Sequence, residues 1–246
     1  MGSFYNYIKG RILMGRMIFE DRREAGRQLG LALEGRGYGM EALLILGIPR
    51  GGLVVAEEVA HVLAAPMDVI IAHKLRAPNQ PELGIGAVVA GDHTPIINEE
   101  VARFAGANPA YLEREIAYQR EQIDRRLKFY RGDRPAPEVF EKTVVVVDDG
   151  IATGYTFRAA LEGLRRRSPL KLVAAAPVAA RDSFDMLTAF ADDVVSLHTP
   201  DDFVAVGAWY RNFDQVSDDE AVSILGRNWA EFRPGTRDRD SVLQKN

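Results

Sequence analysis

The sequence predicts an α/β protein that is doubly wound around a mostly parallel sheet. Several short apolar runs have the length of buried strands, and residues 143–147, TVVVV, are all β-branched. Longer segments with helical spacing of apolar residues separate these runs. Strands that alternate with helices form parallel βαβ units. With 246 residues, of which 47% are apolar, the chain can bury a large core.

The strands and helices are expected to alternate after one N-terminal helix. That helix starts near Phe19 and ends at the glycines of residues 35–39. We expect strands at residues 42–48, 68–72, 143–147, 171–178 and 193–197. We expect the helices between them at residues 53–63, 156–167 and 183–190.

One segment breaks this alternation, and we expect a helical insertion at about residues 98–142. Asn108 is the predicted N-cap of its main helix, with Pro109 at the first helical position. An apolar stripe follows at helical spacing: Leu112, Ile116, Ile123, Leu127 and Tyr130. The pattern favours an amphipathic helix lying on the domain, and a lid or a dimer contact is the alternative.

The insertion belongs to one main domain, which we place at residues 17–232. Residues 1–16 are expected to be an N-terminal extension, and residues 233–246 a loose C-terminal tail. The net charge of −4 argues against a nucleic-acid partner, and no apolar run is long enough to span a membrane. The absence of cysteine excludes disulfides and Cys-ligated zinc. A cytoplasmic location is expected.

The strongest chemical signal is residues 144–156, VVVVDDGIATGYT. A buried strand ends in Asp148 and Asp149, and a loop with two glycines leads into a helix. Ligands of open α/β sheets bind at the carboxyl ends of strands. Backbone N–H groups and hydroxyls of residues 152–156 can bind a phosphate at the helix N-terminus. The two carboxylates would repel a phosphate but suit sugar hydroxyls, so the pattern favours a ribose 5-phosphate.

Competing interpretations of this motif fail on spacing. A Walker-B strand requires a Walker-A loop, yet no lysine in the chain follows a glycine. A phosphatase of the haloacid dehalogenase type needs Asp-x-Asp, and Gly150 stands two positions after Asp148. An ordinary turn that caps a helix remains as the structural alternative.

The motif resembles the phosphoribosyl diphosphate (PRPP) signature of the type I phosphoribosyltransferases, in the form found in adenine-type enzymes. The resemblance implies that Asp148 and Asp149 hold the ribose 2′- and 3′-hydroxyls. The residues implied to bind the 5-phosphate are Ala152, Thr153, Gly154, Tyr155 and Thr156. Ala152 stands where hypoxanthine-type enzymes have an Asp, so a base-activating Asp is not implied here.

Two further loops match the family by position. Arg50, Gly51 and Gly52 follow the first strand, where the family binds pyrophosphate, although an ordinary βα turn would look similar. Lys74 matches a basic residue that meets the pyrophosphate. Residues 75–86 match the flexible loop that closes over the substrate.

The catalytic residues implied are Asp148, Asp149, Lys74 and Arg76, with Glu82 a weaker candidate. His73 and His93 lack metal-ligand spacing and are expected to be structural.

Residues 200–213 are rich in aromatic side chains and resemble the tail of 6-oxopurine phosphoribosyltransferases. Phe203 and Trp209 are therefore candidates for binding the base, and Arg211 stands where those enzymes have an Asp. The alternative is that Trp209 or Tyr210 packs under the amphipathic helix of the insertion.

The resemblance implies a Mg-dependent phosphoribosyltransferase of nucleotide metabolism, in which a nitrogen acceptor, a nucleobase, displaces pyrophosphate from PRPP. Magnesium would be held by substrate oxygens and water rather than by a direct protein cage. A homodimer is expected, with no nucleic-acid or membrane partner. The alternative is a non-catalytic regulatory protein that binds PRPP or a nucleotide on the same fold.

Overall fold

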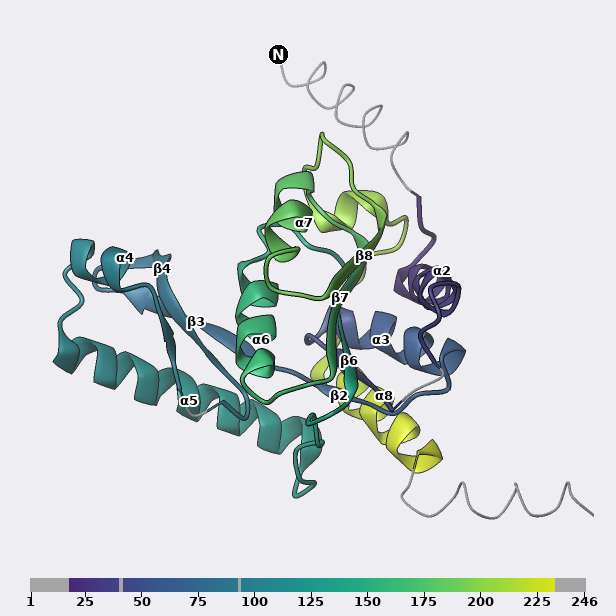
Figure 1. The fold of residues 1–246 in the computed structure, drawn as a ribbon, viewed down its shortest axis with the longest axis horizontal. Coiled ribbons are helices and arrows are strands. Elements are labelled where there is room, and N and C mark those ends of the chain that lie inside the picture. Colours follow the sequence, from purple (N-terminus) through teal and green to yellow (C-terminus); the bar gives the residue numbers. More distant parts are fainter. Residues whose placement is uncertain (1–17, 40–41, 93, 233–246) are drawn as a thin grey trace, which may run out of the picture.

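A parallel sheet forms the centre of the protein, which we describe from a computed structural model of residues 18–39, 42–92 and 94–232. The sheet has five strands in the order β2-β1-β6-β7-β8, and every neighbouring pair is parallel (Figure 1). The strands are β1 (Leu43–Gly47), β2 (Met67–Val69), β6 (Thr143–Val147), β7 (Lys171–Val178) and β8 (Asp193–His198).

Helices cover both faces of this sheet, which confirms the doubly wound α/β fold. Helix α6 (Tyr155–Arg165) lies on one face, and α2 (Arg22–Glu34) and α3 (Gly51–Val62) pack together on the other (Figure 1). The two packed helices approach closely at Gly26 and Gly30, where a Cβ would lie 2.8 Å from atoms of α3. The remaining elements of this part are α7 (Arg181–Leu187), the 3-10 helix η1 (Val206–Trp209) and α8 (Asp218–Glu231).

The central strands are the most predictable elements. Every residue of β1 and β6 is buried, because helices cover both faces of a parallel sheet. Their sequences are therefore continuous apolar runs. The expected strand at residues 68–72 is shorter and earlier, because β2 ends at Val69 and the chain then leaves the sheet.

An arm projects from the central sheet (Figure 1). It contains a three-stranded antiparallel sheet and two helices. Its elements are β3 (Ala72–Ala77), β4 (Gln80–Val89), β5 (Ile96–Ile97), α4 (Glu99–Phe104) and α5 (Pro109–Arg131). The strands β3 and β4 contact both α5 and α6, so the arm is held against the central part.

The loop expected at residues 75–86 has regular structure, because this segment lies in the β3–β4 hairpin. Leu75 and Ile85 are fully buried and supply its apolar inner face. Its two prolines are placed where a hairpin tolerates them. Pro78 lies in the turn with Asn79, and Pro81 is exposed at the start of β4.

The predicted amphipathic helix is confirmed as α5. The Asn108 side chain accepts a hydrogen bond from the Tyr111 N–H, and Pro109 occupies the first turn. Ile123 and Tyr130 of the apolar stripe are buried. The insertion is less helical than expected, because α5 ends at Arg131 and residues 132–142 contain no helix.

Helix α8 was not predicted. The Ser217 side chain caps it by accepting a hydrogen bond from the Glu220 N–H, and its buried side packs on α3 and β2. Asn228 fixes it to the sheet edge, since its side chain accepts from the Met67 N–H and donates to the Ala65 carbonyl. A serine followed by three acidic residues and helical apolar spacing was a usable signal.

Some expectations fall outside the described residues. These are the N-terminal extension at residues 1–16, the tail at residues 233–246, and His93. Among the helices of the described ranges, none is both long enough and apolar enough to cross a bilayer.

Candidate active site

Two loops leave the central sheet side by side at its carboxyl edge. β1 and β6 are paired in parallel so that Gly47 lies opposite Val147. The loop after β1 starts α3 at Gly51 and Gly52, and the loop after β6 carries Asp148 and Asp149. The structure therefore brings together the two motifs that the sequence placed about a hundred residues apart.

The two glycines allow the carboxylates to lie directly against the start of α3. A Cβ on Gly51 would lie 1.9 Å from Asp149 Oδ2, and a Cβ on Gly52 would lie 2.8 Å from Asp148 Oδ1. Any side chain at either glycine would displace a carboxylate. Because both positions lack a Cβ, the backbone of the first turn of α3 and the two carboxylates can lie side by side.

The two neighbouring carboxylates differ in their surroundings. Burial, and then the charge of Asp149, raise the pKa of Asp148 well above its ordinary value. Asp148 Oδ1 accepts a hydrogen bond from the Asp149 N–H at 2.8 Å. Asp149 is instead ion-paired, with its Oδ2 2.7 Å from Arg22 Nε.

Arg22 is a residue of the candidate site that sequence reasoning missed. It lies in the first turn of α2, also donates to the Asp214 carbonyl at 2.7 Å, and has its guanidinium 3.7 Å from the centroid of the Phe213 ring. Arg22 and Asp149 are 127 positions apart, and no local motif marks the arginine. Only the packing of α2 beside α3 brings it to the site.

The predicted 5-phosphate loop packs against α7. Gly154 is the N-cap of α6 with a φ of 71°, and a Cβ there would lie 2.6 Å from Met186 Cε. Ser183 Oγ donates to the Ala152 carbonyl at 2.6 Å, which fixes the loop. Several residues of this loop remain exposed: Ala152, Thr153, Tyr155 and Thr156. The backbone N–H groups that begin α6 and two threonine hydroxyls are thus available to an anion.

The predicted cations Arg50 and Lys74 pair with other carboxylates. Arg50 caps α3, follows a cis peptide bond from Pro49, and has Nη1 3.9 Å from Asp218 Oδ1. Lys74 lies on β3, with Nζ 3.3 Å from both the carbonyl and Oε2 of Glu82. Within the described part of the chain, neither cation is hydrogen-bonded or ion-paired to Asp148 or Asp149.

Arg76 lies further along β3 than Lys74, toward the hairpin turn. Its backbone N–H donates to Glu115 Oε1 at 3.1 Å, and its carbonyl accepts from Tyr111 Oη at 2.9 Å. Its side chain is exposed. His73, at the start of β3, has Nδ1 3.1 Å from Gln119 Oε1, and burial lowers its pKa.

The aromatic segment packs behind the carboxylate loop. Trp209 is 5% exposed and joins Tyr210 in a small core with Phe19, so the alternative of packing under α5 is wrong. The Tyr210 hydroxyl donates to the Asp149 carbonyl. Phe203 is partly exposed and stacks on Trp209 with ring centroids 6.5 Å apart.

The segment also contains a buried donor that lacks a partner. No hydrogen bond is made by Trp209 Nε1 to any described residue. Arg211, which stands where the 6-oxopurine enzymes have an Asp, pairs with Glu20 at 3.1 Å. The aromatic segment is thus joined to the carboxylate loop, and Phe203 is its most accessible candidate for binding a base.

These features define an open α/β domain in which two glycine-bearing loops meet at the carboxyl edge of the sheet, with a carboxylate pair between them. The chain belongs to the phosphoribosyl transferase domain family, whose model matches residues 30–211.

Comparison with known proteins gives relatives of the same kind. Two Mycobacterium tuberculosis proteins, Rv0571c and MT0597, are named as proposed phosphoribosyl transferases and are 40% identical over 215 residues. The match covers 87% of this chain and 48% of theirs, so the chain spans about half the length of these curated relatives. The crystal structure of TT1426 from Thermus thermophilus has a TM-score of 0.76 and 42% identity, and the match covers 85% of this chain and 98% of that one.

Proposed function

We propose that this chain is a phosphoribosyltransferase that transfers the ribose 5-phosphate of PRPP to a nitrogen acceptor, a nucleobase. The observation that carries the proposal is the adjacency of two glycine-bearing helix N-termini at one sheet edge, with Asp148 and Asp149 between them. A substrate with two phosphate-bearing groups on one sugar matches this arrangement. The names of the Mycobacterium tuberculosis relatives support it.

The proposed reaction is a displacement at the anomeric carbon of the ribose. The acceptor nitrogen forms a bond to this carbon and gives up its proton to water, and the bond from the carbon to the pyrophosphate oxygen breaks, with its electron pair leaving on pyrophosphate. Asp148 and Asp149 would hold the ribose hydroxyls, and the start of α6 would hold the 5-phosphate. Arg50 and Lys74 would stabilise the charge that develops on pyrophosphate.

Magnesium is part of this proposal. Within the described ranges, His, Cys, Asp and Glu side chains form no group of three or more that could hold a metal ion. A magnesium ion bound mainly by pyrophosphate oxygens and water fits this donor set, and it would neutralise leaving-group charge.

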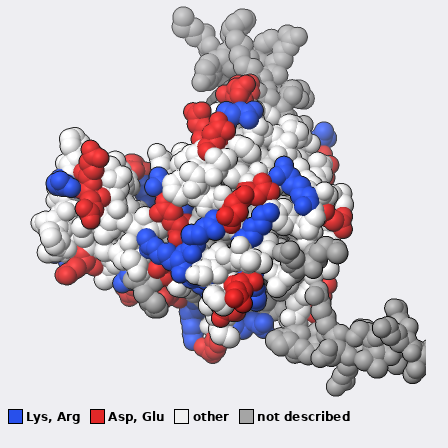
Figure 2. All heavy atoms as spheres, in the orientation of Figure 1, with Lys and Arg blue, Asp and Glu red and all other residues white. Residues whose placement is uncertain are grey.

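We also propose a cytoplasmic homodimer that acts in nucleotide metabolism and has no nucleic-acid or membrane partner. The family resemblance supports the dimer and the metabolic role. On the face drawn in Figure 2, Lys and Arg side chains are interspersed with Asp and Glu, without the broad basic surface typical of a nucleic-acid-binding protein.

A regulatory protein that binds PRPP without turnover is the second candidate. The observation in its favour is that both proposed pyrophosphate-binding cations already face carboxylates. Lys74 is ion-paired with Glu82, and Arg50 lies near Asp218. These cations would have to leave their carboxylates to meet a pyrophosphate.

The discriminating experiment measures pyrophosphate release from Mg-PRPP with a panel of purine, pyrimidine and other amine acceptors, together with PRPP binding by calorimetry. Release with at least one acceptor supports the transferase. Binding without release across the panel favours the regulatory protein, and no binding contradicts both. For substitutions of Asp148 or Asp149, Asp201→Asn is a suitable control, because Asp201 pairs only loosely with Arg181 at 3.4 Å on the surface.

A further inference from the structure

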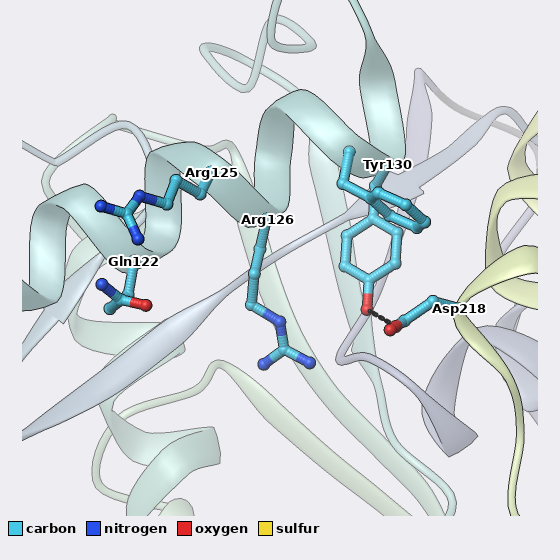
Figure 3. Close-up of a pocket in the computed structure, with 6 residues that line it drawn as sticks. Gln122, Arg125, Arg126, Tyr130 and Asp218 are labelled. Atoms are coloured by element: carbon cyan, nitrogen blue, oxygen red, sulfur yellow. Dashed lines mark hydrogen bonds between the residues drawn. The ribbon is translucent and has the colours of Figure 1, made fainter.

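A recess of about 150 Å³ opens between the second half of α5 and the start of α8 (Figure 3). Its walls are built by one acidic residue, two arginines and three other side chains: Gln122, Arg125, Arg126, Phe129, Tyr130 and Asp218. No motif of the sequence pointed to it. The recess lies close to the proposed pyrophosphate loop, which follows β1.

The end of α5 is fixed at the carboxyl edge of the central sheet. Arg131 Nε lies 2.7 Å from Asp68 Oδ1, and its Nη2 donates to the Val69 carbonyl at 2.8 Å. Both charged side chains are less than 10% exposed, at 8% and 7%. Because Val69 pairs with Gly47 of β1, this anchor holds α5 beside the loop that follows β1.

The opposite wall of the recess leads to the same loop. The Tyr130 hydroxyl donates to Asp218 Oδ1 at 2.9 Å, as Figure 3 shows. The same carboxylate oxygen lies 3.9 Å from Nη1 of Arg50, the residue that caps α3. A single carboxylate therefore joins the recess to the proposed pyrophosphate loop.

Two of the three charged side chains in the recess have partners of opposite charge. Arg125 forms an ion pair with Glu121 on its own helix, and Asp218 has Arg50 beside it. Arg126 forms no ion pair with any carboxylate among the described residues, and its guanidinium extends from α5 toward the same side as the Tyr130 hydroxyl (Figure 3). It is a cation available to an incoming anion.

The charge of Arg126 acts on two titratable side chains, His73 and Tyr130. Burial lowers the pKa of His73, and the charge of Arg126 adds to this effect. Burial and the hydrogen bond to Asp218 raise the pKa of Tyr130, and the charge and hydrogen bonding of Arg126 oppose this rise. Arg126 therefore acts both on His73, which precedes Lys74 on β3, and on Tyr130, which bonds Asp218 of α8.

We propose that Arg126 is a further binding residue for the pyrophosphate group and that α5 serves to carry this cation to the leaving-group side of the site. The inference rests on the proposed function. A pyrophosphate carries more negative charge than Arg50 and Lys74 alone would balance, and a guanidinium binds phosphate oxygens through paired N–H groups. Arg126 would supply a further positive charge from α5, in addition to Arg50 at the start of α3 and Lys74 on β3.

The test is calorimetric titration of pyrophosphate into the full chain, with magnesium and saturating ribose 5-phosphate. Ribose 5-phosphate fills the 5-phosphate loop, so that added pyrophosphate reports on the leaving-group side. We expect Arg126→Gln to weaken pyrophosphate binding about tenfold or more, and Arg126→Lys to weaken it less. The affinity for ribose 5-phosphate should stay within about twofold in both variants.

Arg114→Gln is the matched control, because Arg114 is an exposed arginine of the same helix about 18 Å away along its axis. It should bind both ligands like the unmodified chain. Unchanged pyrophosphate affinity in Arg126→Gln overturns the inference, as does an equal loss in Arg114→Gln. Failure of the unmodified chain to bind ribose 5-phosphate overturns the proposed function itself, and is a separate outcome.

Discussion

Arg22 Nε lies 2.7 Å from Asp149 Oδ2, and this ion pair joins the first turn of α2 to the end of β6. The side chains are 11% and 15% exposed, so water screens the pair only weakly. The same arginine lies over the Phe213 ring and donates to the Asp214 carbonyl. Arg22 thus connects Asp149, a proposed ribose-binding residue, with Asp214, which follows the aromatic segment.

We expect Arg22→Gln to lower the free energy of unfolding by about 3 kcal/mol, because it leaves the Asp149 charge unpaired beside Asp148. PRPP binding should weaken as well, and Arg22→Lys should recover part of both losses. Chemical denaturation and calorimetry with Mg-PRPP measure the two effects. Arg181→Gln, which removes an exposed arginine, serves as the control, and equal losses in the two variants would contradict the role of Arg22.

Asp148 should make the protein less stable as pH rises. Its pKa is raised in the folded state, so the native protein holds this proton more tightly than the unfolded chain does. The free energy of unfolding therefore falls as pH increases above the ordinary value of 3.8 and through the raised pKa. Asp148→Asn should remove this dependence and stabilise the protein at pH 7 but not at pH 3. Parallel stability–pH curves for the two proteins would refute the assignment.

The β3–β4 hairpin should be protected by substrate. We expect trypsin to cut after Arg76 slowly in the free protein and more slowly still with Mg-PRPP. Tyr111→Phe should speed cutting of the free protein, because it removes the hydrogen bond to the Arg76 carbonyl. Cleavage rates that do not respond to Mg-PRPP would argue against a hairpin that closes over the substrate.

Phe203 and Trp209 should respond differently to truncation. Trp209→Ala should destabilise the fold by about 3–5 kcal/mol, since the side chain is buried in a core with Phe19 and Tyr210. Phe203→Ala should change the melting temperature little and weaken acceptor binding by roughly 1–3 kcal/mol, the size of a stacking interaction. A large loss of melting temperature in both variants would place Phe203 in the core rather than at the base site.

The sequence predicted those parts of the fold whose cause is local. β6 and β7 have the predicted bounds because strands buried on both faces are continuous apolar runs. The start of α5 was equally readable, since Asn108 and Pro109 form a local cap. The hairpin was not predicted as strands, because prolines at its turn and edge obscured the alternation of Leu75 and Ala77.

The loops of the candidate site were predictable from the sequence, but the arginines that neighbouring helices bring to it were not. Gly51, Gly52 and the two aspartates lie in short motifs whose residue types show their chemistry. Arg22 and Arg126 reach the site through the packing of helices, and neither has a neighbouring motif. Long-range ion pairs such as Arg22–Asp149 depend on tertiary structure, which single-sequence reasoning cannot supply.

The central claim is that the carboxylate pair binds the ribose of PRPP, and calorimetry of Mg-PRPP with Asp149→Asn tests it most directly. The substitution keeps the shape of the side chain and removes its charge. We expect a loss of about 1.5–3 kcal/mol in PRPP binding, the size of a charge-assisted hydrogen bond, with PRPP affinity unchanged in Asp201→Asn. PRPP affinity equal to that of the unmodified protein in both Asp149→Asn and Asp148→Asn would contradict it.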